Sequence, residues 1–335
     1  MSVAEHTLER LAEASARPSA ERSQRMLVIV NPHATGTSER LRQLVLYALQ
    51  GRYEVDAVDT QRKGHAIELC REAAAEDYDL VVTFGGDGTV NEAANGLAGT
   101  RTPLFVLPGG SNNVLCRILG IPDDVVDATG RLLRAADALR TRAIDLARVN
   151  GRWFTFSAGV GLDASVVERV DRHPNLKRRF GPWYFTASAL STFLRRYVVH
   201  PPSLEVEVAG RRHRGVSAMV QNARPYTFFD RVPVHLAEGV TLDSGDLAGV
   251  VLTRASAVDL PTIAWRALSP TARIVGHRRV TDFSGVAGVV VRSRDGRAIP
   301  VHVDGDHIGD EREARFSVSP RALRVVAQPP PGVTR

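Results

Sequence analysis

A regular alternation of short apolar runs and helical stretches occupies the chain from Met26 to about Leu139. The apolar runs lie at 26–31, 53–58, 79–84 and 103–108, and the expected helices between them lie at 37–50, 64–75 and 89–97. Strands and helices in alternation are typical of a mainly parallel sheet with helices packed on its faces. This part of the chain is therefore predicted to form an α/β domain.

A second pattern, made of short strands and turns, begins after Thr141. A hairpin is expected at 143–160, because Asn150-Gly151 is a strong signal for a tight two-residue turn. Further strands are expected at 204–209, 216–221, 247–252, 286–293, 298–304, 314–319 and 323–328, with helical stretches at 182–198 and 255–268. The alternation within these strands predicts an antiparallel, β-sandwich-like domain.

The length of 335 residues favours two domains over one. The first 25 residues lack an apolar signal core, and we expect them to form a polar, mobile leader. We expect the α/β domain at 26–143 and the β-rich domain at 144–327, with a last strand that can return to the first domain. The residues at 328–335 are expected to form a frayed tail.

An excess of basic side chains narrows the choice of partner. The chain has 43 Lys and Arg against 37 Asp and Glu, a net charge of +6 that favours nucleic acid, a membrane surface or a phosphate-rich ligand. The arginine-rich stretches at 172–180, 211–214 and 277–279 lack interleaved aromatic side chains, so we expect no nucleic-acid partner. Only Cys70 and Cys116 are present, which excludes a disulfide framework and fits a cytoplasmic setting.

The segment TFGGDGTVNEAANGL at 83–97 is the most informative about chemistry. A buried strand is expected to end there, and the glycines of the loop at 85–88 let backbone N–H groups approach an anion at the start of a helix. Asp87 within this loop suits a site where a metal ion neutralises phosphates or where a proton is accepted. The alternative is a plain strand-to-helix turn in which Thr89 and Glu92 form a capping box.

Two further polar loops follow strands of the same predicted sheet. NPHATG at 31–36 follows the first strand, and PGGSNN at 108–113 follows the fourth. Loops after the carboxyl ends of parallel strands converge on one ligand crevice, so three such loops favour a phosphate site. The lysine of a Walker A loop is absent from all three, which excludes a P-loop nucleotide site.

These motifs together resemble the catalytic domain of the diacylglycerol kinase and sphingosine kinase family, in its bacterial lipid kinase branch. The resemblance rests on VNPHATG, GGDGTVNE and LPGGSNNVLCRILGIP, on DLARVNGRWFTFSAGVGLDASVV, and on VHVDGD with FSVSPRALRVV. It covers nearly all of the chain from Met26 to Ala327. It implies a nucleotide-binding α/β domain followed by a β-sandwich-like lipid-substrate domain, with ATP bound between them.

The same resemblance implies which residues contact ATP and which act in catalysis. Asn31 would orient the first loop, and the expected ATP contacts are Thr60, Gly85, Gly86, Asp87, Gly88, Thr89, Val90, Asn91 and Ser111. The expected catalytic residues are Asp87, Asp306 and Asp145. Asp306 stands where the family usually has glutamate, one methylene longer. The alternatives are that Asp304-Gly305 forms only a hairpin turn and that Asp145 is a strand-start residue facing solvent.

A structural magnesium site is a further implication of the resemblance. Bacterial members often carry it around an Asp-Asp-Gly-Leu-Leu stretch, which TLDSGDL at 241–247 replaces here. Ser244 stands in the position of the usual carboxylate ligand. Thr241 and Asp246 would contribute backbone oxygens, and Asp243 or Asp246 could substitute by its side chain.

The activity implied by the resemblance is an ATP- and Mg²⁺-dependent transfer of a phosphoryl group to a lipid hydroxyl, with diacylglycerol as the leading acceptor. Two alternatives stay open: an NAD kinase-like enzyme, whose family shares a GGDG loop, and a catalytically silent lipid- or nucleotide-binding regulator. The expected partner is a lipid substrate at a membrane surface, and a homodimer with a second copy of the chain is not excluded.

Contact with a membrane would be peripheral, at the inner face of the membrane. No apolar run approaches the roughly 18–20 residues of a transmembrane helix. The segment at 178–197 places Trp183, Ala187, Leu190 and Leu194 along one face of an expected helix, with arginines at both ends. It fits a helix that packs on the core, and it also fits a helix that lies on an anionic membrane.

Overall fold

The computed structural model describes residues 24–34, 38–136, 139–161, 202–229, 231–254, 256, 258–269 and 271–326, together with Thr7. The chain divides into two compact units. The first comprises Met1–Ile144 with Arg321–Arg335, and the second comprises Asp145–Pro320. The predicted helix at 182–198 and the predicted tail at 328–335 lie outside the described residues. Of the predicted leader, only Thr7, Gln24 and Arg25 lie inside them.

The sheet of the first unit consists of strands that pair in parallel. Its order is β2 (Tyr53–Asp59), β1 (Gln24–Val30), β3 (Leu80–Gly85), β4 (Leu104–Pro108) and the end of β18 (Glu313–Val326). Met26 lies opposite Leu80, and Val325 lies opposite Leu104. β3 and β4 are buried along their whole length, as expected for central parallel strands with both faces covered. The predicted α/β fold with a mainly parallel sheet is confirmed.

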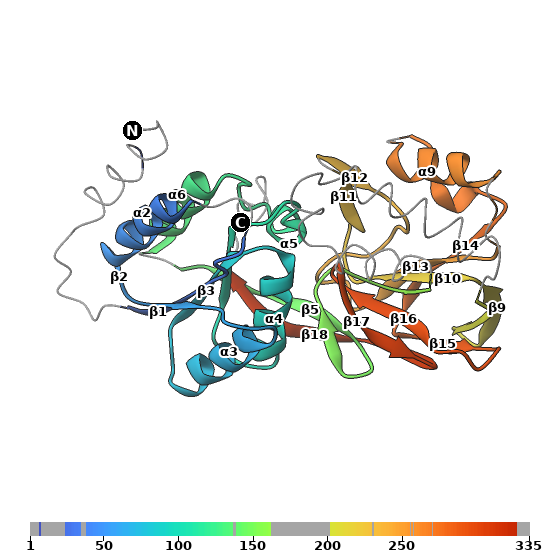
Figure 1. The fold of residues 1–335 in the computed structure, drawn as a ribbon, viewed down its shortest axis with the longest axis horizontal. Coiled ribbons are helices and arrows are strands. Elements are labelled where there is room, and N and C mark those ends of the chain that lie inside the picture. The colour runs from blue at the N-terminus through green and yellow to red at the C-terminus, as the bar shows by residue number, and fades with distance from the viewer. Residues whose placement is uncertain are drawn as a thin grey trace. The chain divides into compact units, whose positions relative to one another are not determined.

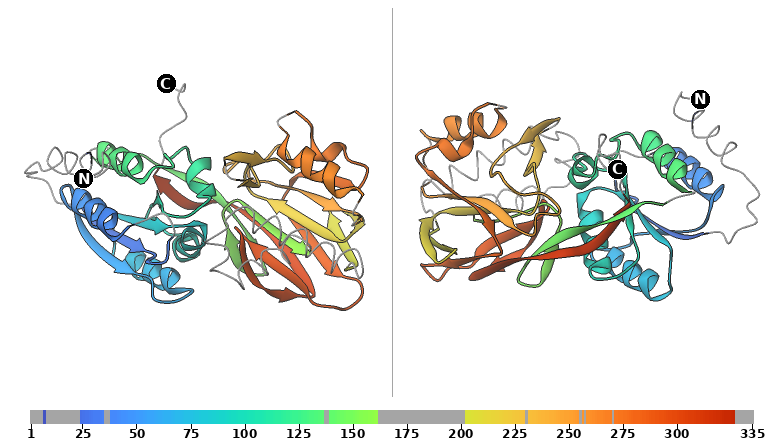
Figure 2. Two further views of the ribbon diagram at one scale, coloured as in Figure 1. Left: turned by 45° about the horizontal axis from the view of Figure 1, so that its top comes forward. Right: turned by 180° about the vertical axis from the view of Figure 1, so that it is seen from behind.

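Helices cover both faces of this sheet (Figures 1 and 2). They are α2 (Glu39–Gln50), α3 (His65–Ala75), α4 (Asp87–Leu97), α5 (Val114–Ile118) and α6 (Val125–Ala135). α2 and α6 lie on one face, while α3 and α4 lie on the other. Side-chain caps start two of them, since Ser38 Oγ accepts from Leu41 N at 3.2 Å and Asp124 Oδ1 accepts from Val126 N at 2.8 Å.

Both cysteines are buried in the first unit, and burial raises the pKa of each thiol from 9.0 to about 12. Cys70 faces Gly96 of α4, where an added Cβ would lie 2.4 Å from the Cys70 Cβ. We expect neither thiol to react with a thiol reagent such as DTNB at pH 8.5 in the folded protein, and both to react after unfolding in urea. Rapid reaction of either thiol in the folded protein would contradict this arrangement.

The raised thiol pKa values also predict how stability depends on pH. A folded-state pKa above the unfolded value means that the folded state keeps its protons as the pH rises, while the unfolded chain loses them. The contribution of both thiols to stability is therefore complete below about pH 8.5 and declines as the pH rises towards 12. Urea unfolding at pH 7 and pH 10, with a Cys70→Ala, Cys116→Ala double variant as control, measures this decline.

The second unit is built from two antiparallel sheets. One has the order β14 (Val280–Val286), β13 (Leu247–Leu252), β10 (Ser217–Gln221), β7 (Ser157–Gly161), β16 (Ile299–Val303) and β17 (Asp306–Glu311). The other contains β18, β15 (Gly288–Ser293), β8 (Leu204–Val208) and β9 (Arg211–Gly215), with β5 (Thr141–Val149) and β6 (Arg152–Phe154) at β18. The remaining elements of this unit's described residues are the hairpin of β11 (Thr227–Phe229) and β12 (Val232–Val234), α9 (Leu260–Leu268) and a 3₁₀ turn at Ile274–Gly276.

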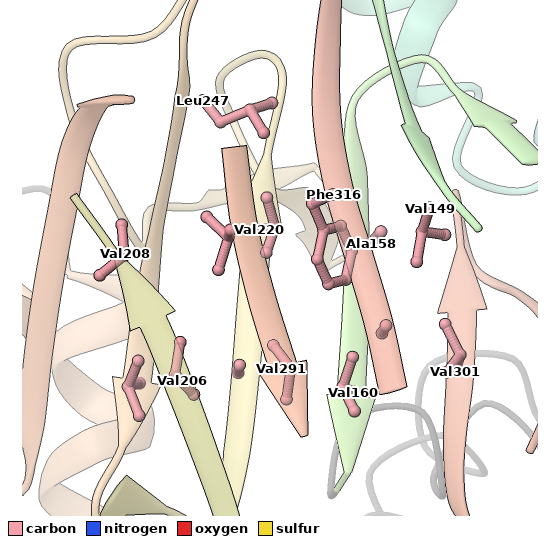
Figure 3. Close-up of a cluster of buried hydrophobic side chains, with 14 of the residues drawn as sticks. Val149, Ala158, Val160, Val206, Val208, Val220, Leu247, Val291, Val301 and Phe316 are labelled. Atoms are coloured by element: carbon pink, nitrogen blue, oxygen red, sulfur yellow. The ribbon is translucent and has the colours of Figure 1, made fainter. Parts of the chain in front are cut away.

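Side chains from the two sheets meet in one hydrophobic core (Figure 3). Val206, Val291 and Phe316 come from β8, β15 and β18, and they face Val160 and Val301 from β7 and β16. Phe154 and Phe316 pack edge to face, with ring centroids 6.4 Å apart. The predicted β-sandwich-like architecture is confirmed for this unit.

Several expected elements differ in extent. The strands expected at 314–319 and 323–328 form the single strand β18, which continues through Pro320 and Arg321. Its partners change there: Ser317 pairs with Gly288 on one side of Pro320, and Val325 pairs with Leu104 on the other. A proline, which lacks an N–H, suits a point between two sets of pairings. The strands β9, β11, β12, β14 and β17 are absent from the sequence prediction.

The helix expected at 255–268 is shorter than predicted. α9 begins at Leu260, because Pro261 fits only within the first turn of a helix. Among the helices of the described residues, none combines the length and the apolar character required to cross a membrane.

Candidate active site

The carboxyl edge of the parallel sheet gathers the loops that follow its strands. Asn31, after β1, donates its backbone N–H to Phe84 O of β3 at 3.0 Å. Thr60, after β2, donates to Val30 O at 2.8 Å, and Gly109, after β4, donates to Gly85 O at 2.9 Å. All the loops expected to bind phosphate therefore start at one edge of the first unit, as their positions after parallel strands predict.

The two glycine loops at 85–88 and 109–110 stack backbone against backbone. An added Cβ on Gly110 would lie 2.6 Å from Gly86 Cα, and one on Gly109 would lie 3.2 Å from Gly85 Cα. Real Cβ atoms do not approach backbone as closely as 2.6 Å, and 3.2 Å is a tight contact, so the stacking requires glycine at position 110 and favours it at position 109. The stacking places two glycine loops side by side at the N-terminus of α4, where the helix carries a positive partial charge.

Asp87 connects these loops to a second helix. It is the first residue of α4, and its Oδ1 accepts a hydrogen bond from Val114 N, at the start of α5, at 2.7 Å. An acidic residue in the first turn of a helix interacts favourably with the helix dipole. The carboxylate is half-buried and held in a fixed orientation at the edge where the loops meet. It is therefore placed to hold a cation or to accept a proton from a ligand at this edge.

The other residues expected to contact ATP divide into buried and accessible groups. Thr89, Val90 and Asn91 are buried; the side chain of Asn91 accepts from Asn95 Nδ2 at 3.2 Å. Gly88 is half-buried and Ser111 is exposed at the same edge. Gly85 is buried as well, so the accessible members of the expected set at this edge include Gly86, Gly88 and Ser111.

Asn31 organises the first loop through both ends of its amide. Its Nδ2 donates to Thr89 Oγ1 at 3.3 Å, and its Oδ1 accepts from His33 N at 3.0 Å. The side chain thus links the loop after β1 to the first turn of α4. The proposed role of Asn31 in orienting this loop is compatible with these two contacts.

The capping box expected from Thr89 and Glu92 is absent, because α4 begins at Asp87, two residues earlier. Glu92 instead caps the neighbouring helix α3. Its Oε1 accepts from Gly64 N at 2.7 Å and its Oε2 accepts from Ala66 N at 3.2 Å. Gly64, at the N-cap position of α3, has no side chain to provide such a cap.

Replacing Glu92 by alanine is expected to lower the free energy of unfolding by about 1–3 kcal/mol, because the first N–H groups of α3 lose their acceptor. Urea unfolding followed by circular dichroism measures the change. Glu72→Ala is the matched control, since Glu72 is exposed on α3, and its replacement should change the free energy by less than about 0.5 kcal/mol. Equal unfolding midpoints for the two variants would contradict the capping role.

The loop after β4 is fixed by residues that the sequence prediction missed. Asn113 adopts a left-handed conformation, and its side chain accepts from Gly110 N at 2.9 Å and donates to Asp123 Oδ1 at 3.1 Å. Arg117 pairs with the same Asp123 at 2.7 Å. Asparagine is favoured at left-handed turn positions, and its place at the end of the stretch Gly-Gly-Ser-Asn-Asn at 109–113 could have identified Asn113.

Asp145 lies in the second unit and is buried, with 2% of its surface exposed. The alternative, in which Asp145 is a strand-start residue that faces solvent, is therefore wrong. Its Oδ2 accepts from Gly245 N at 2.7 Å, and its backbone carbonyl accepts from Asn222 Nδ2 at 2.9 Å. These contacts connect the middle of β5 to the loop at 241–246 and to Asn222, directly after β10.

The loop at 241–246 is closed by its own hydrogen bonds. Thr241 O accepts from Ser244 N at 3.2 Å and from Ser244 Oγ at 3.1 Å, while Thr241 Oγ1 donates to Asp243 at 2.9 Å. Ser244 contributes a neutral hydroxyl, and Asp246 is half-buried nearby in the chain. Mg²⁺ requires several oxygen ligands directed at one point. In the described part of the chain, no group of three or more His, Cys, Asp or Glu residues could hold a metal ion. The predicted ligands are mainly backbone oxygens, which lie outside such groups, so the magnesium site at this loop stays a prediction.

Asp304 and Asp306 flank the tight turn between β16 and β17. Asp304 and Gly305 have φ angles of 48° and 84°, so the hairpin turn is present. Asp304 is buried and accepts from Thr155 N at 2.7 Å, Thr155 Oγ1 at 2.9 Å, Phe156 N at 3.0 Å and Ser157 N at 3.1 Å. Asp306 begins β17 opposite Val303 and is half-buried. The turn is therefore anchored by Asp304 and presents Asp306 two residues later.

Comparison with known proteins shows which proteins the chain is similar to. Residues 25–149 match the family model of the diacylglycerol kinase catalytic domain. The diacylglycerol kinase of Bacillus subtilis is 29% identical over 253 residues, which cover 73% of this chain and 78% of that protein. The diacylglycerol kinase of Staphylococcus carnosus is 24% identical over 300 residues, which cover 87% and 91%.

A solved structure shows the same fold. The crystal structure of a diacylglycerol kinase from Bacillus anthracis superimposes with a TM-score of 0.70 at 22% identity, covering 92% of this chain and 99% of that one. The fold is thus shared over nearly the whole length, and the sequence match lies on the unit that carries the stacked glycine loops. Residues 25–149 are thus similar to a diacylglycerol kinase catalytic domain, and most of the chain is similar to a bacterial diacylglycerol kinase.

Proposed function

We propose that this protein is a lipid kinase that transfers the γ-phosphoryl group of ATP to a hydroxyl of diacylglycerol and so forms phosphatidic acid. The observation that carries the proposal is the stacked pair of glycine loops at the N-terminus of α4, with Asp87 fixed beside them. Diacylglycerol kinases of Bacillus subtilis and Staphylococcus carnosus support the choice of acceptor.

The first unit would bind the phosphates of ATP. Phosphoryl transfer depends mainly on alignment and on stabilisation of charge on the phosphate oxygens. Backbone N–H groups of the loops at 85–88 and 109–110, with the helix dipole of α4, supply that stabilisation. Mg²⁺, when bound with ATP, offsets the phosphate charge. The half-buried carboxylate of Asp87 fits a ligand for this ion.

Proton transfer from the acceptor hydroxyl needs a base, and two carboxylates are candidates. Asp87 lies at the phosphate-binding edge, and its hydrogen bond to Val114 N fixes its orientation. Asp306 is presented by a turn that the buried carboxylate of Asp304 holds in place. Buried Asp145 is better placed to support the loop at 241–246 than to accept a proton, because it accepts from Gly245 N at 2.7 Å.

A phosphorylation assay with labelled ATP tests the proposal. The purified full chain is incubated with labelled ATP, Mg²⁺ and one acceptor at a time: diacylglycerol, monoacylglycerol, sphingosine or NAD. Label is expected in phosphatidic acid. ATP binding without transfer to any acceptor would support a silent regulator instead, and transfer to NAD would support an NAD kinase. Either result would overturn the proposed activity.

A further inference from the structure

Helix α9 of the second unit exposes one apolar face. Ile263 and Ala267, four residues apart, pack on the core formed with Tyr226 and Ile274. The opposite face carries Trp265, whose surface is 61% exposed, and Leu268, which is 37% exposed. Val258, two residues before the helix, is 82% exposed.

Large exposed hydrophobic side chains are concentrated at α9 and the residues just before it. Among the described residues, the large exposed hydrophobic side chains are Tyr47, Val232, Val258, Trp265 and Leu268. Three of these five therefore lie within eleven consecutive residues, 258–268. Single exposed apolar side chains are ordinary on protein surfaces, whereas a group of them on one helix face indicates an interaction surface.

Arginines lie around this face and are held there by hydrogen bonds. Arg278 donates to Asp259, the residue before α9, at 2.8 Å, and Arg279 donates to the same carboxylate at 3.3 Å. Arg266, on the helix itself, donates to Arg273 O at 2.9 Å. These contacts hold a set of guanidinium groups at both ends of a short helix.

The charge of this surface is positive. Arg254 is a further arginine close to Arg279 in the fold, because the backbone N–H of its neighbour Thr253 donates to Arg279 O at 2.8 Å. Arg278 is 70% exposed although it contacts Asp259, and Arg273 is 69% exposed although it pairs with Glu238 at 3.0 Å. The five arginines 254, 266, 273, 278 and 279 exceed the two paired acids, Asp259 and Glu238, by three charges.

We propose that this surface, the α9 face, docks onto an anionic phospholipid membrane, with Trp265, Leu268 and Val258 in the interfacial layer and the arginines at the headgroups. Tryptophan favours the membrane interface, and basic side chains are attracted to the negative potential at the surface of an anionic membrane. Arginine side chains can lay their apolar stems along the helix while their charges stay in water. This inference rests on the proposed function, because a diacylglycerol acceptor is reached at a membrane.

Vesicle co-sedimentation without ATP tests the docking surface. The full chain is mixed with vesicles of phosphatidylcholine alone or with 30% phosphatidylglycerol, a composition of about one anionic lipid in three. The wild type is expected to sediment with the anionic vesicles and to be released by high salt. Trp265→Ser and Leu268→Ser, tested separately, are each expected to weaken binding by about tenfold, and Arg254→Gln by about threefold.

Tyr47→Ser is the matched control, since Tyr47 is 60% exposed in the first unit and lies outside the α9 face. It should bind vesicles like the wild type. The proposal is overturned if the wild type binds vesicles equally well with and without phosphatidylglycerol. It is also overturned if Trp265→Ser and Leu268→Ser bind as tightly as the wild type. Circular dichroism melting of each variant identifies a fold defect, and two independent apolar variants keep the test decisive if one of them fails to fold.

A second readout separates this inference from the proposed activity. In detergent micelles with a short-chain diacylglycerol, no membrane has to be reached, so Trp265→Ser should phosphorylate the acceptor at the wild-type rate. On anionic vesicles the same variant should be about tenfold slower. Absence of phosphorylation by the wild type in micelles would overturn the proposed function, and the sedimentation result would still decide the docking surface.

Discussion

Replacing Asp304 by alanine is expected to lower the free energy of unfolding by about 3–5 kcal/mol. The buried carboxylate accepts four hydrogen bonds from residues 155–157, and its removal leaves these donors unpaired away from water. Asp304 also has a positive φ of 48°, a conformation in which alanine is less favourable than aspartate. The shift in the urea unfolding transition, followed by circular dichroism, measures the loss.

Asp310→Asn is the control for this prediction, because Asp310 lies on β17 in the same hairpin but is exposed. Its contact with His307 at 3.2 Å is a surface pair, and its loss should change the free energy by less than about 1 kcal/mol. Asp304→Asn should fall between the two variants, since the amide keeps one acceptor oxygen and tolerates the left-handed conformation. An unchanged midpoint for Asp304→Ala would show that the hairpin does not depend on this carboxylate.

Asp87→Asn is expected to reduce phosphoryl transfer by a factor of about 10²–10⁴ while the fold stays intact. Asparagine keeps an Oδ1 that can accept from Val114 N, so the connection between α4 and α5 is preserved. It loses the negative charge, and with it the capacity to hold a cation or to take a proton. Initial rates of phosphatidic acid formation, together with thermal melting, separate the two effects.

A carboxylate in an equivalent place on another helix provides the matched control. Asp127 lies in the first turn of α6, as Asp87 does in α4, but it is exposed and belongs to no expected site. Asp127→Asn should therefore transfer phosphate at the wild-type rate. Turnover by Asp87→Asn within threefold of wild type would rule out Asp87 as base and cation ligand, and Asp306 would then be the remaining candidate base.

The periodic pattern of the sequence was sufficient to predict most of the fold. Parallel strands such as Leu80–Gly85 are buried on both faces and stand out as short apolar runs between helices. The hairpin at Asn150-Gly151 follows from local turn chemistry, and both residues have the expected positive φ. Local signals of this kind need only a few neighbouring residues, so they are visible without a structure.

Contacts between distant residues were not predictable in the same way. Glu92 lies three residues after Thr89, so local spacing suggested a capping box, whereas its carboxylate reaches Gly64, 28 residues away. Asp304 meets Thr155 across 149 residues, and Asn222 meets Asp145 across 77. Short strands such as Val232–Val234 carry too few residues for a period to be recognised. The long-range hydrogen bonds that hold the loops of the candidate site in place could therefore be identified only from the structure.

Strand β18 has a consequence for the order of events during synthesis. Residues 321–326 complete the sheet of the first unit, where Val325 pairs with Leu104 and Ala322 O accepts from Gly99 N at 2.7 Å. These residues leave the ribosome after the whole second unit, although the rest of the first unit is made before it. Domains generally fold as units during translation, N-terminal first. Here the edge of β4 stays unpaired until the end of β18 has been synthesised, so a nascent chain that stalls before Arg321 carries a first unit whose sheet lacks its last strand.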